Sequence, residues 1–143
     1  MTLNKSIIAI RCELQNSKIR KSGTNKFAGF TYFELSDFLP KLNELMMKHE
    51  MNDIFSIQSN DLGEQEATLT LVKGDEKQTY RIPFKLFETP LNSKGIKSMQ
   101  DVQYLGAMNT YYKRYLYLNA FGITDGEIID AMDNTNVKPV TKE

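Results

Sequence analysis

The chain has 143 residues, with 18 basic and 18 acidic side chains, one cysteine and one histidine. This length is typical of a single domain that can bury a core without disulfides or metals. With one cysteine and one histidine, neither an internal disulfide nor a zinc site of the Cys/His type can form within one chain.

The sequence also lacks the motifs of several functional classes. It contains no run of about 18 apolar residues, so no membrane span is expected, and its apolar start is too short and interrupted for a signal peptide. It has no GxxxxGK[ST] or GxGxxG phosphate loop, and His49 lies within a helical pattern among methionines rather than in a catalytic triad. We therefore expect an intracellular binding protein that is not an enzyme and uses no cofactor or metal.

Charge alternates along the chain although the net charge is zero. Residues 1–26 carry six cations and one anion, and residues 73–114 carry eight cations and four anions. By contrast, residues 27–72 carry two cations and eight anions, and residues 115–143 carry two cations and five anions. This alternation allows a basic surface on a neutral protein, or contacts between acidic and basic faces of identical subunits. It is also compatible with neutralisation of the segments within one fold.

The first predicted helix covers residues 3–16, where leucine and isoleucine recur at helical spacing. A basic loop around Gly23 follows, in which Lys21 and Lys26 are candidate phosphate contacts, although such loops are also often simply solvated. The aromatic stretch 27–33 is either a short strand or an extended segment. A second helix is expected to begin at Ser36 as its cap, with Pro40 in the first turn.

Three strand-like runs follow at 53–59, 67–72 and 80–87, because apolar residues alternate with polar ones in each. They predict an antiparallel meander with one face on the helices and a turn at residues 74–76. Pro83 places the third run at an edge or a bulge of the sheet. Arg81 and Lys85 would then lie on the other face of the sheet, with Phe87 beside them.

The longest predicted helix begins at Ser98, its expected cap, and ends at Gly122, which suits the left-handed position after a helix. One face is mostly apolar and comprises Val102, Leu105, Met108, Tyr112, Tyr115, Leu116 and Asn119. The opposite face comprises Gln103, Gly106, Thr110, Lys113, Arg114 and Tyr117. This opposite face is either the solvated back of a core helix or a surface for a polyanion backbone.

On the second interpretation the two cations, Lys113 and Arg114, hold phosphates. Thr110 and Gln103 add neutral hydrogen-bonding groups, and Tyr117 stacks a base or a sugar. After this helix, residues 128–132 predict a short helix among acidic side chains, and residues 134–143 are expected to be a frayed tail.

Three blocks of this sequence resemble the ERF (essential recombination function) family of phage-type single-strand annealing proteins. They are KSIIAIRCELQN near the start, FTYFELSDFLPKLNELMMKHEM in the middle, and GIKSMQDVQYLGAMNTYYKRYLYLNAFGI. In the third and most specific block, the residues that match the family pattern are Gln103, Gly106, Ala107, Tyr112, Lys113, Arg114, Tyr115, Leu118 and Ile123. The acidic cluster that follows is looser than the contiguous aspartate run of the family, and the variable C-terminal extension of many relatives is not expected here.

The resemblance implies a single annealing domain over residues 1–133. Its fold would be α+β, with an antiparallel β-meander packed against a long central helix, the ERF/Rad-type core of the annealing superfamily, and with flanking N-terminal and C-terminal helices. It implies rings or filaments of identical subunits that bind single-stranded DNA by its backbone and anneal complementary strands without ATP in phage homologous recombination. The partner types that it suggests are a single-strand-binding protein and a phage exonuclease, and the location is the cytoplasm of the host cell.

In that setting one groove would gather the basic side chains that the sequence presents separately. The cations of this expected groove are Lys113, Arg114, Arg81, Lys85, Lys21 and Lys26.

Two other functions remain open from the residues. A small protein-interaction or regulatory module could use the acidic segment from Glu34 to Glu66 without binding DNA. A metal-dependent nuclease could use Asp125, Asp130 and Asp133, but no histidine or lysine stands at motif spacing beside them, which disfavours this function.

Overall fold

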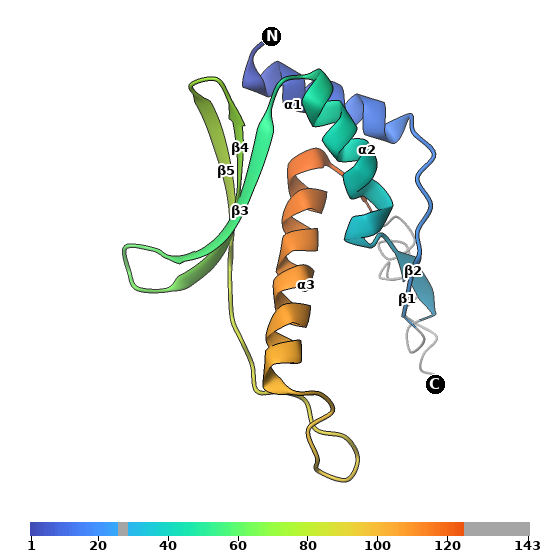
Figure 1. Ribbon diagram of the computed structural model, residues 1–143, viewed down its shortest axis with the longest axis vertical. Coiled ribbons are helices and arrows are strands. Elements are labelled where there is room, and N and C mark those ends of the chain that lie inside the picture. The colour runs from blue at the N-terminus through green and yellow to red at the C-terminus, as the bar shows by residue number, and fades with distance from the viewer. Residues whose placement is uncertain (26–28, 125–143) are drawn as a thin grey trace, which may run out of the picture.

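The computed structural model describes residues 1–25 and 29–124. These residues form an α+β fold in the order α1, β1, β2, α2, β3, β4, β5, α3, with a three-stranded sheet (β3–β4–β5) and a separate hairpin (β1–β2). In Figure 1, α3 runs along the long axis between this sheet on one side and the hairpin on the other. Helices α1 and α2 pack around the C-terminal end of α3. The predicted α+β class and antiparallel meander are confirmed.

Helix α1 (Leu3–Gln15) is the helix expected at residues 3–16. Its four periodic apolar side chains, Leu3, Ile7, Ile10 and Leu14, are all buried, which confirms the predicted core face. The hydroxyl of Thr2 caps the helix by accepting a hydrogen bond from the Lys5 amide at 3.2 Å.

Helix α2 (Leu35–Lys48) begins before Ser36, so the prediction of Ser36 as its cap is wrong. The cap position is Glu34, whose amide donates to the Asp37 carboxylate at 2.8 Å. This capping box satisfies the Glu34 amide, and the Asp37 carboxylate in the first turn also interacts favourably with the helix dipole. As a consequence Pro40 lies in the interior of the helix, not in its first turn.

The three-stranded sheet follows the predicted meander closely. Strands β3 (Asn52–Ser59), β4 (Gln65–Lys73) and β5 (Glu76–Pro83) pair antiparallel, with Thr68 of β4 opposite Ser56 and Arg81. The two-residue turn between β4 and β5 contains Gly74 at a φ of +59°, a value that favours glycine. Pro83 ends the edge strand β5, as its missing N–H predicts.

A second, unexpected pairing lies in the basic loop. Strand β1 (Gly23–Asn25) pairs with β2 (Phe30–Tyr32), and Gly23 stands directly opposite Tyr32. A Cβ on Gly23 would meet the Tyr32 ring at 2.4 Å, so only glycine fits under this ring. The expected loop is therefore a hairpin at this point, and Gly23 leaves room for the Tyr32 ring.

Helix α3 (Asp101–Phe121) ends at Gly122 in the left-handed conformation (φ +64°), as predicted. Its first residue follows Gln100, however, and the Ser98 hydroxyl donates to the Pro90 carbonyl at 2.9 Å. The prediction of Ser98 as the cap is therefore wrong, because this hydroxyl is used by the preceding connector.

The predicted apolar face of α3 is also wrong in most of its members. Leu116 is buried and Met108 and Tyr112 are half-buried, whereas Val102, Leu105, Tyr115 and Asn119 are exposed. The buried residues of the helix instead lie in its last turns: Leu116, Tyr117, Leu118, Ala120 and Phe121. The physical reason is that α1, α2 and the sheet enclose only this end, while the N-terminal half extends beyond them beside the connector 84–100 (Figure 1).

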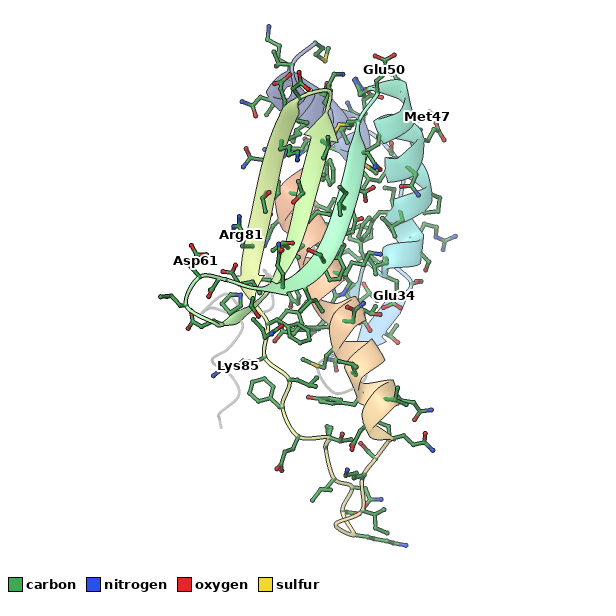
Figure 2. The ribbon with its side chains drawn as sticks, turned by 60° about the vertical axis from the view of Figure 1, so that its left-hand side comes forward. Glu34, Met47, Glu50, Asp61, Arg81 and Lys85 are labelled. Carbon is green, nitrogen blue, oxygen red and sulfur yellow. The ribbon has the colours of Figure 1, made fainter. Side chains whose placement is uncertain are left out.

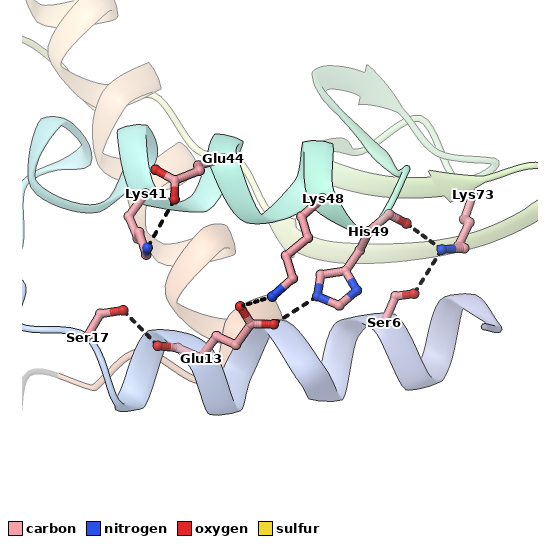
Figure 3. A network of polar contacts seen from close by, with 8 residues as sticks. All are labelled: Ser6, Glu13, Ser17, Lys41, Glu44, Lys48, His49 and Lys73. Carbon is pink, nitrogen blue, oxygen red and sulfur yellow. Dashed lines mark hydrogen bonds and ion pairs between the residues drawn. The ribbon is translucent and has the colours of Figure 1, made fainter.

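Charged groups between α1, α2 and β4 are tied into a structural network (Figure 3). The Glu13 carboxylate bridges Lys48 at 3.0 Å and His49 at 2.9 Å, and hydrogen bonds from His49 and then Lys48 lower the pKa of Glu13. The Lys73 ammonium donates to the buried Ser6 hydroxyl at 3.1 Å and to the His49 carbonyl. His49 thus has a structural role, in agreement with its predicted place beside the core.

None of the described helices combines the length and the apolar character that a membrane crossing requires. The short helix expected at residues 128–132, the tail and the domain boundary at residue 133 lie outside the described residues.

Candidate nucleic-acid interface

The two adjacent cations of α3 lie against aromatic rings on different sides of the helix. The Lys113 ammonium lies 5.7 Å from the centre of the Phe55 ring on β3. The Arg114 guanidinium lies 4.7 Å from the centre of the Tyr32 ring on β2. Successive helical residues diverge by about 100° around the helix axis, so one residue faces the sheet and the next faces the hairpin.

Arg114 is also flanked by two tyrosines of its own helix. Its guanidinium lies 5.9 Å from the centre of the Tyr111 ring and 5.1 Å from that of Tyr115. The two rings pack edge to face, with centres 4.8 Å apart and planes at 68°. We call Tyr32, Tyr111, Arg114 and Tyr115 the aromatic–arginine cluster. A planar, permanently charged guanidinium suits this setting because it stacks on rings and still donates hydrogen bonds.

The two helical tyrosines of this cluster, Tyr111 and Tyr115, remain open to solvent. Tyr111 is 45% exposed and Tyr115 is 40% exposed. A hydrogen bond with Tyr115 raises the pKa of the Tyr111 hydroxyl, with partial burial as the next cause. Two exposed phenol rings therefore lie beside the Arg114 guanidinium.

Lys21 lies at the open end of the same hairpin, where Tyr32 also stands. Its ammonium lies 5.4 Å from the centre of the Phe33 ring, directly after β2. The neighbouring Ser22 donates from both its amide and its hydroxyl to Asp37 at 2.9 Å, which attaches this segment to the start of α2. The structure therefore brings Lys21 and Arg114 to one hairpin, whereas Lys26 lies outside the described residues.

The cations of the β5 region lie elsewhere. Arg81 is exposed on the sheet face opposite α3 and pairs with Glu66 at 3.5 Å. The backbone of Lys85 exchanges two hydrogen bonds with the Tyr112 hydroxyl, at 3.0 and 3.1 Å, while its side chain points outward (Figure 2). Among the described residues the expected single groove does not form, because the sheet separates Arg81 from the cations of α3.

Tyr117 is not a stacking residue at the surface, so that prediction is wrong. The residue is 3% exposed, and its ring packs against Phe38 and Phe121. Its hydroxyl donates to the Asp53 carboxylate, and burial together with this contact raises the pKa of Tyr117 far above its usual value. Its helical spacing puts Tyr117 on the same face as Lys113, but it lies in the last turns of the helix, which the rest of the fold encloses.

The two neutral candidates on α3 are both exposed. The Gln103 side chain accepts from the Gln100 amide at 3.2 Å and so caps the helix start. Thr110 lies in the middle of the helix. Contacts of either residue with a nucleic-acid backbone stay predictions.

Three further aromatic residues were missed by the sequence reasoning. Tyr32 and Phe55 are far from α3 in sequence, so only the tertiary fold reveals that they support its cations. Tyr111 could have been found, because it precedes Tyr115 by four residues and such pairs lie on one helix face.

Within residues 1–25 and 29–124, no group of three or more histidine, cysteine, aspartate or glutamate side chains could hold a metal ion. The aspartates considered for a nuclease, Asp125, Asp130 and Asp133, lie outside these residues.

Comparison with known proteins identifies a family. The model of the ERF superfamily matches residues 4–143, which is nearly the whole chain. No curated protein and no solved structure matches it at the level required for significance. The family suggested by the three sequence blocks is therefore confirmed, and this chain belongs to the ERF superfamily.

Proposed function

We propose that this protein binds single-stranded DNA and anneals complementary strands in phage homologous recombination, without ATP and without enzymatic chemistry. The observation that carries the proposal is that Lys113 and Arg114 each lie over aromatic rings and give α3 a cation–aromatic surface on two of its sides. Membership of the ERF superfamily points to strand annealing in phage recombination, and the surface has the chemical groups that a DNA strand requires.

Phosphate contacts would come from the cations of this surface. Lys113 and Arg114 can neutralise phosphates and release counterions, so binding is expected to weaken steeply with salt. Holding a strand by its backbone leaves the base edges free to test a second strand. Each duplex step then contributes about 1.4 kcal/mol of stacking, so a run of correct pairs outweighs the lost protein contacts. Base pairing supplies the energy and the specificity, which is why the proposal needs no nucleotide hydrolysis.

A second part of the proposal is assembly with further copies of the same chain. The connector 84–100 and the first half of α3 expose a set of apolar side chains that we call the apolar surface: Leu86, Phe87, Leu91, Ile96, Val102 and Leu105, each between 44% and 69% exposed. Large exposed apolar side chains concentrated on neighbouring segments of the chain are typical of protein–protein contacts. A second copy covering this surface would produce a ring or a filament, and repeated weak sites on one strand would give avidity.

The test is the mass of the protein in solution, with and without a single-stranded oligonucleotide, at low and high salt. We expect an oligomer that loads the oligonucleotide at low salt and releases it at high salt. A strand-pairing assay without ATP, using two complementary oligonucleotides, should then show faster pairing with the protein than without it.

The opposite result is equally clear. A monomer or dimer that ignores DNA at every salt concentration would contradict the proposal. The protein-interaction module that uses the acidic segment would then be the better explanation.

A further inference from the structure

The aromatic–arginine cluster contains more ring surface than phosphate binding requires. Cations alone would suffice to hold a strand by its backbone, yet Arg114 is surrounded by three tyrosine rings. Tyr111 and Tyr115 lie one helical turn apart, and nearly half of each side chain faces solvent. Solvent-facing rings beside a cation are the usual elements of a site that stacks nucleobases.

We propose that the rings of Tyr111 and Tyr115 form a stacking platform for bases of single-stranded DNA, while Arg114 holds the adjacent phosphate. The proposal rests on the function proposed above and adds the recognition of the bases themselves. It moves the stacking role from the buried Tyr117 to two rings that are accessible.

The packing of the cluster explains how the platform keeps its shape. Arg114 lies over both rings and Tyr112 packs against Tyr111, so the part of the pair left for a ligand is the exposed 45% of Tyr111 and 40% of Tyr115. Arg114 lies between Tyr115 and the hairpin residue Tyr32, which fixes the guanidinium before any strand binds. The hairpin in turn holds Tyr32 over Gly23, where a side chain would collide with the ring. A platform organised in advance loses little conformational entropy on binding.

A nucleobase is a better occupant of these rings than a second copy of the chain. The cluster contains the Arg114 guanidinium, while the neighbouring Lys113 faces the sheet. The apolar surface, by contrast, lies toward the other end of α3 and in the connector. Rings mixed with cations suit a polyanion with aromatic bases, while aliphatic side chains suit a protein contact.

Stacking is also compatible with annealing. A tyrosine ring contacts the face of a base and leaves its Watson–Crick edge free for a complementary strand. When a duplex forms, the base needs the same face to stack on its neighbours. The tyrosine ring and the neighbouring bases of the duplex therefore compete for the same face of the base, and pairing releases the strand from the platform.

The experiment compares two oligomers of equal length at one salt concentration: oligothymidylate, and an abasic oligomer that has the same phosphates but no bases. The full chain should bind oligothymidylate about 5- to 150-fold more tightly, the range for one stacked base. Tyr111→Leu/Tyr115→Leu should lose this preference but keep the affinity for the abasic oligomer. Tyr111→Phe/Tyr115→Phe keeps the rings and should keep the preference.

Tyr104→Leu on the same helix is the matched control, because Tyr104 lies outside the cluster, and it should behave as the parent does.

A Leu double variant that stays folded by circular dichroism and retains the base preference overturns the platform. A parent that binds both oligomers equally overturns the platform but leaves DNA binding intact. A parent that binds neither overturns the proposed function and the platform with it. Loss of oligomer mass in the Leu variant, without loss of base preference, would assign the rings to a subunit contact instead.

Discussion

Lys113 and Arg114 are neighbours in sequence, yet their cationic groups lie over rings on different sides of α3, at 5.7 Å from Phe55 of the sheet and 4.7 Å from Tyr32 of the hairpin. This divergence means that α3 connects the two parts of the fold through its charged residues. The two positive charges stand on adjacent residues, and contact of one DNA backbone with both stays a prediction.

Removal of both cations should weaken DNA binding. Lys113→Ala/Arg114→Ala should lower the affinity for single-stranded DNA and reduce the slope of log affinity against log salt by roughly 1.4, because two phosphate contacts of about 0.7 each are lost. Titration by fluorescence anisotropy at several salt concentrations measures this slope. Lys48→Ala is the control, because Lys48 pairs with Glu13 between α1 and α2 and should leave the slope unchanged. An unchanged slope in the folded double variant would show that these cations are only structural.

Tyr117→Phe separates packing from DNA contact. The variant keeps the buried ring but loses the hydrogen bond to Asp53, which joins α3 to β3. We expect a loss of about 1–3 kcal/mol in the free energy of unfolding, measured by urea denaturation. Affinity for single-stranded DNA should stay at the parent value. A variant with normal stability and weaker DNA binding would reinstate Tyr117 as a DNA contact.

The variant Gly106→Ala tests whether a ligand or a second copy of the chain packs closely against the exposed half of α3. The new Cβ would meet nothing within 4 Å in the described chain. Alanine in a helix interior is favoured over glycine, so the variant should gain about 0.5–1 kcal/mol in the free energy of unfolding. Gly23→Ala is the contrasting variant, because its Cβ would collide with Tyr32 and should destabilise the fold. If Gly106→Ala stabilises the protein but weakens DNA loading or lowers the oligomer mass, a ligand or a second copy comes close at this glycine.

Asp37 should make stability depend on pH. Partial burial acts to raise the pKa of this carboxyl, but hydrogen bonds donated by Glu34 and Ser22 outweigh it and hold the pKa below the usual 3.8. Since the folded-state pKa is the lower one, the ionised group stabilises the fold above the usual pKa, and this stabilisation disappears as pH falls through the folded-state pKa.

The measurement is the urea midpoint from about pH 5 downward, for the parent and for Asp37→Asn. The parent should lose more stability than the variant as the pH falls, so the two curves should converge. Parallel curves would mean that Asp37 does not contribute through its charge.

The apolar surface should control assembly. Phe87→Ser/Val102→Ser changes two of its most exposed side chains, at 62% and 69%. We expect a smaller mass by light scattering with an unchanged circular dichroism spectrum, because neither side chain is part of the core. Met47→Ser is a matched control, since Met47 is 81% exposed but lies on α2, away from this surface (Figure 2). An unchanged mass in the double variant would exclude this surface as the subunit contact.

The sequence by itself determined most of the local structure. Apolar spacing predicted α1 and its four buried side chains, and alternation predicted the meander with Pro83 at its edge. Gly122 marked the end of α3. These features depend on neighbours within a few residues, where periodicity and backbone preference are sufficient. The family could also be recognised, because the motif around Lys113 and Arg114 is local.

Only the tertiary structure decided which side chains of α3 are accessible. Tyr117 and Tyr111 are similar tyrosines in one helix, yet the first is enclosed by Phe38 and Phe121 while the second faces solvent. The helix itself has no strong apolar side, so burial along it depends on which distant elements reach each turn. Burial is a property of the assembled chain, because the free energy of removing a ring from water is gained only where other parts of the fold are present to cover it.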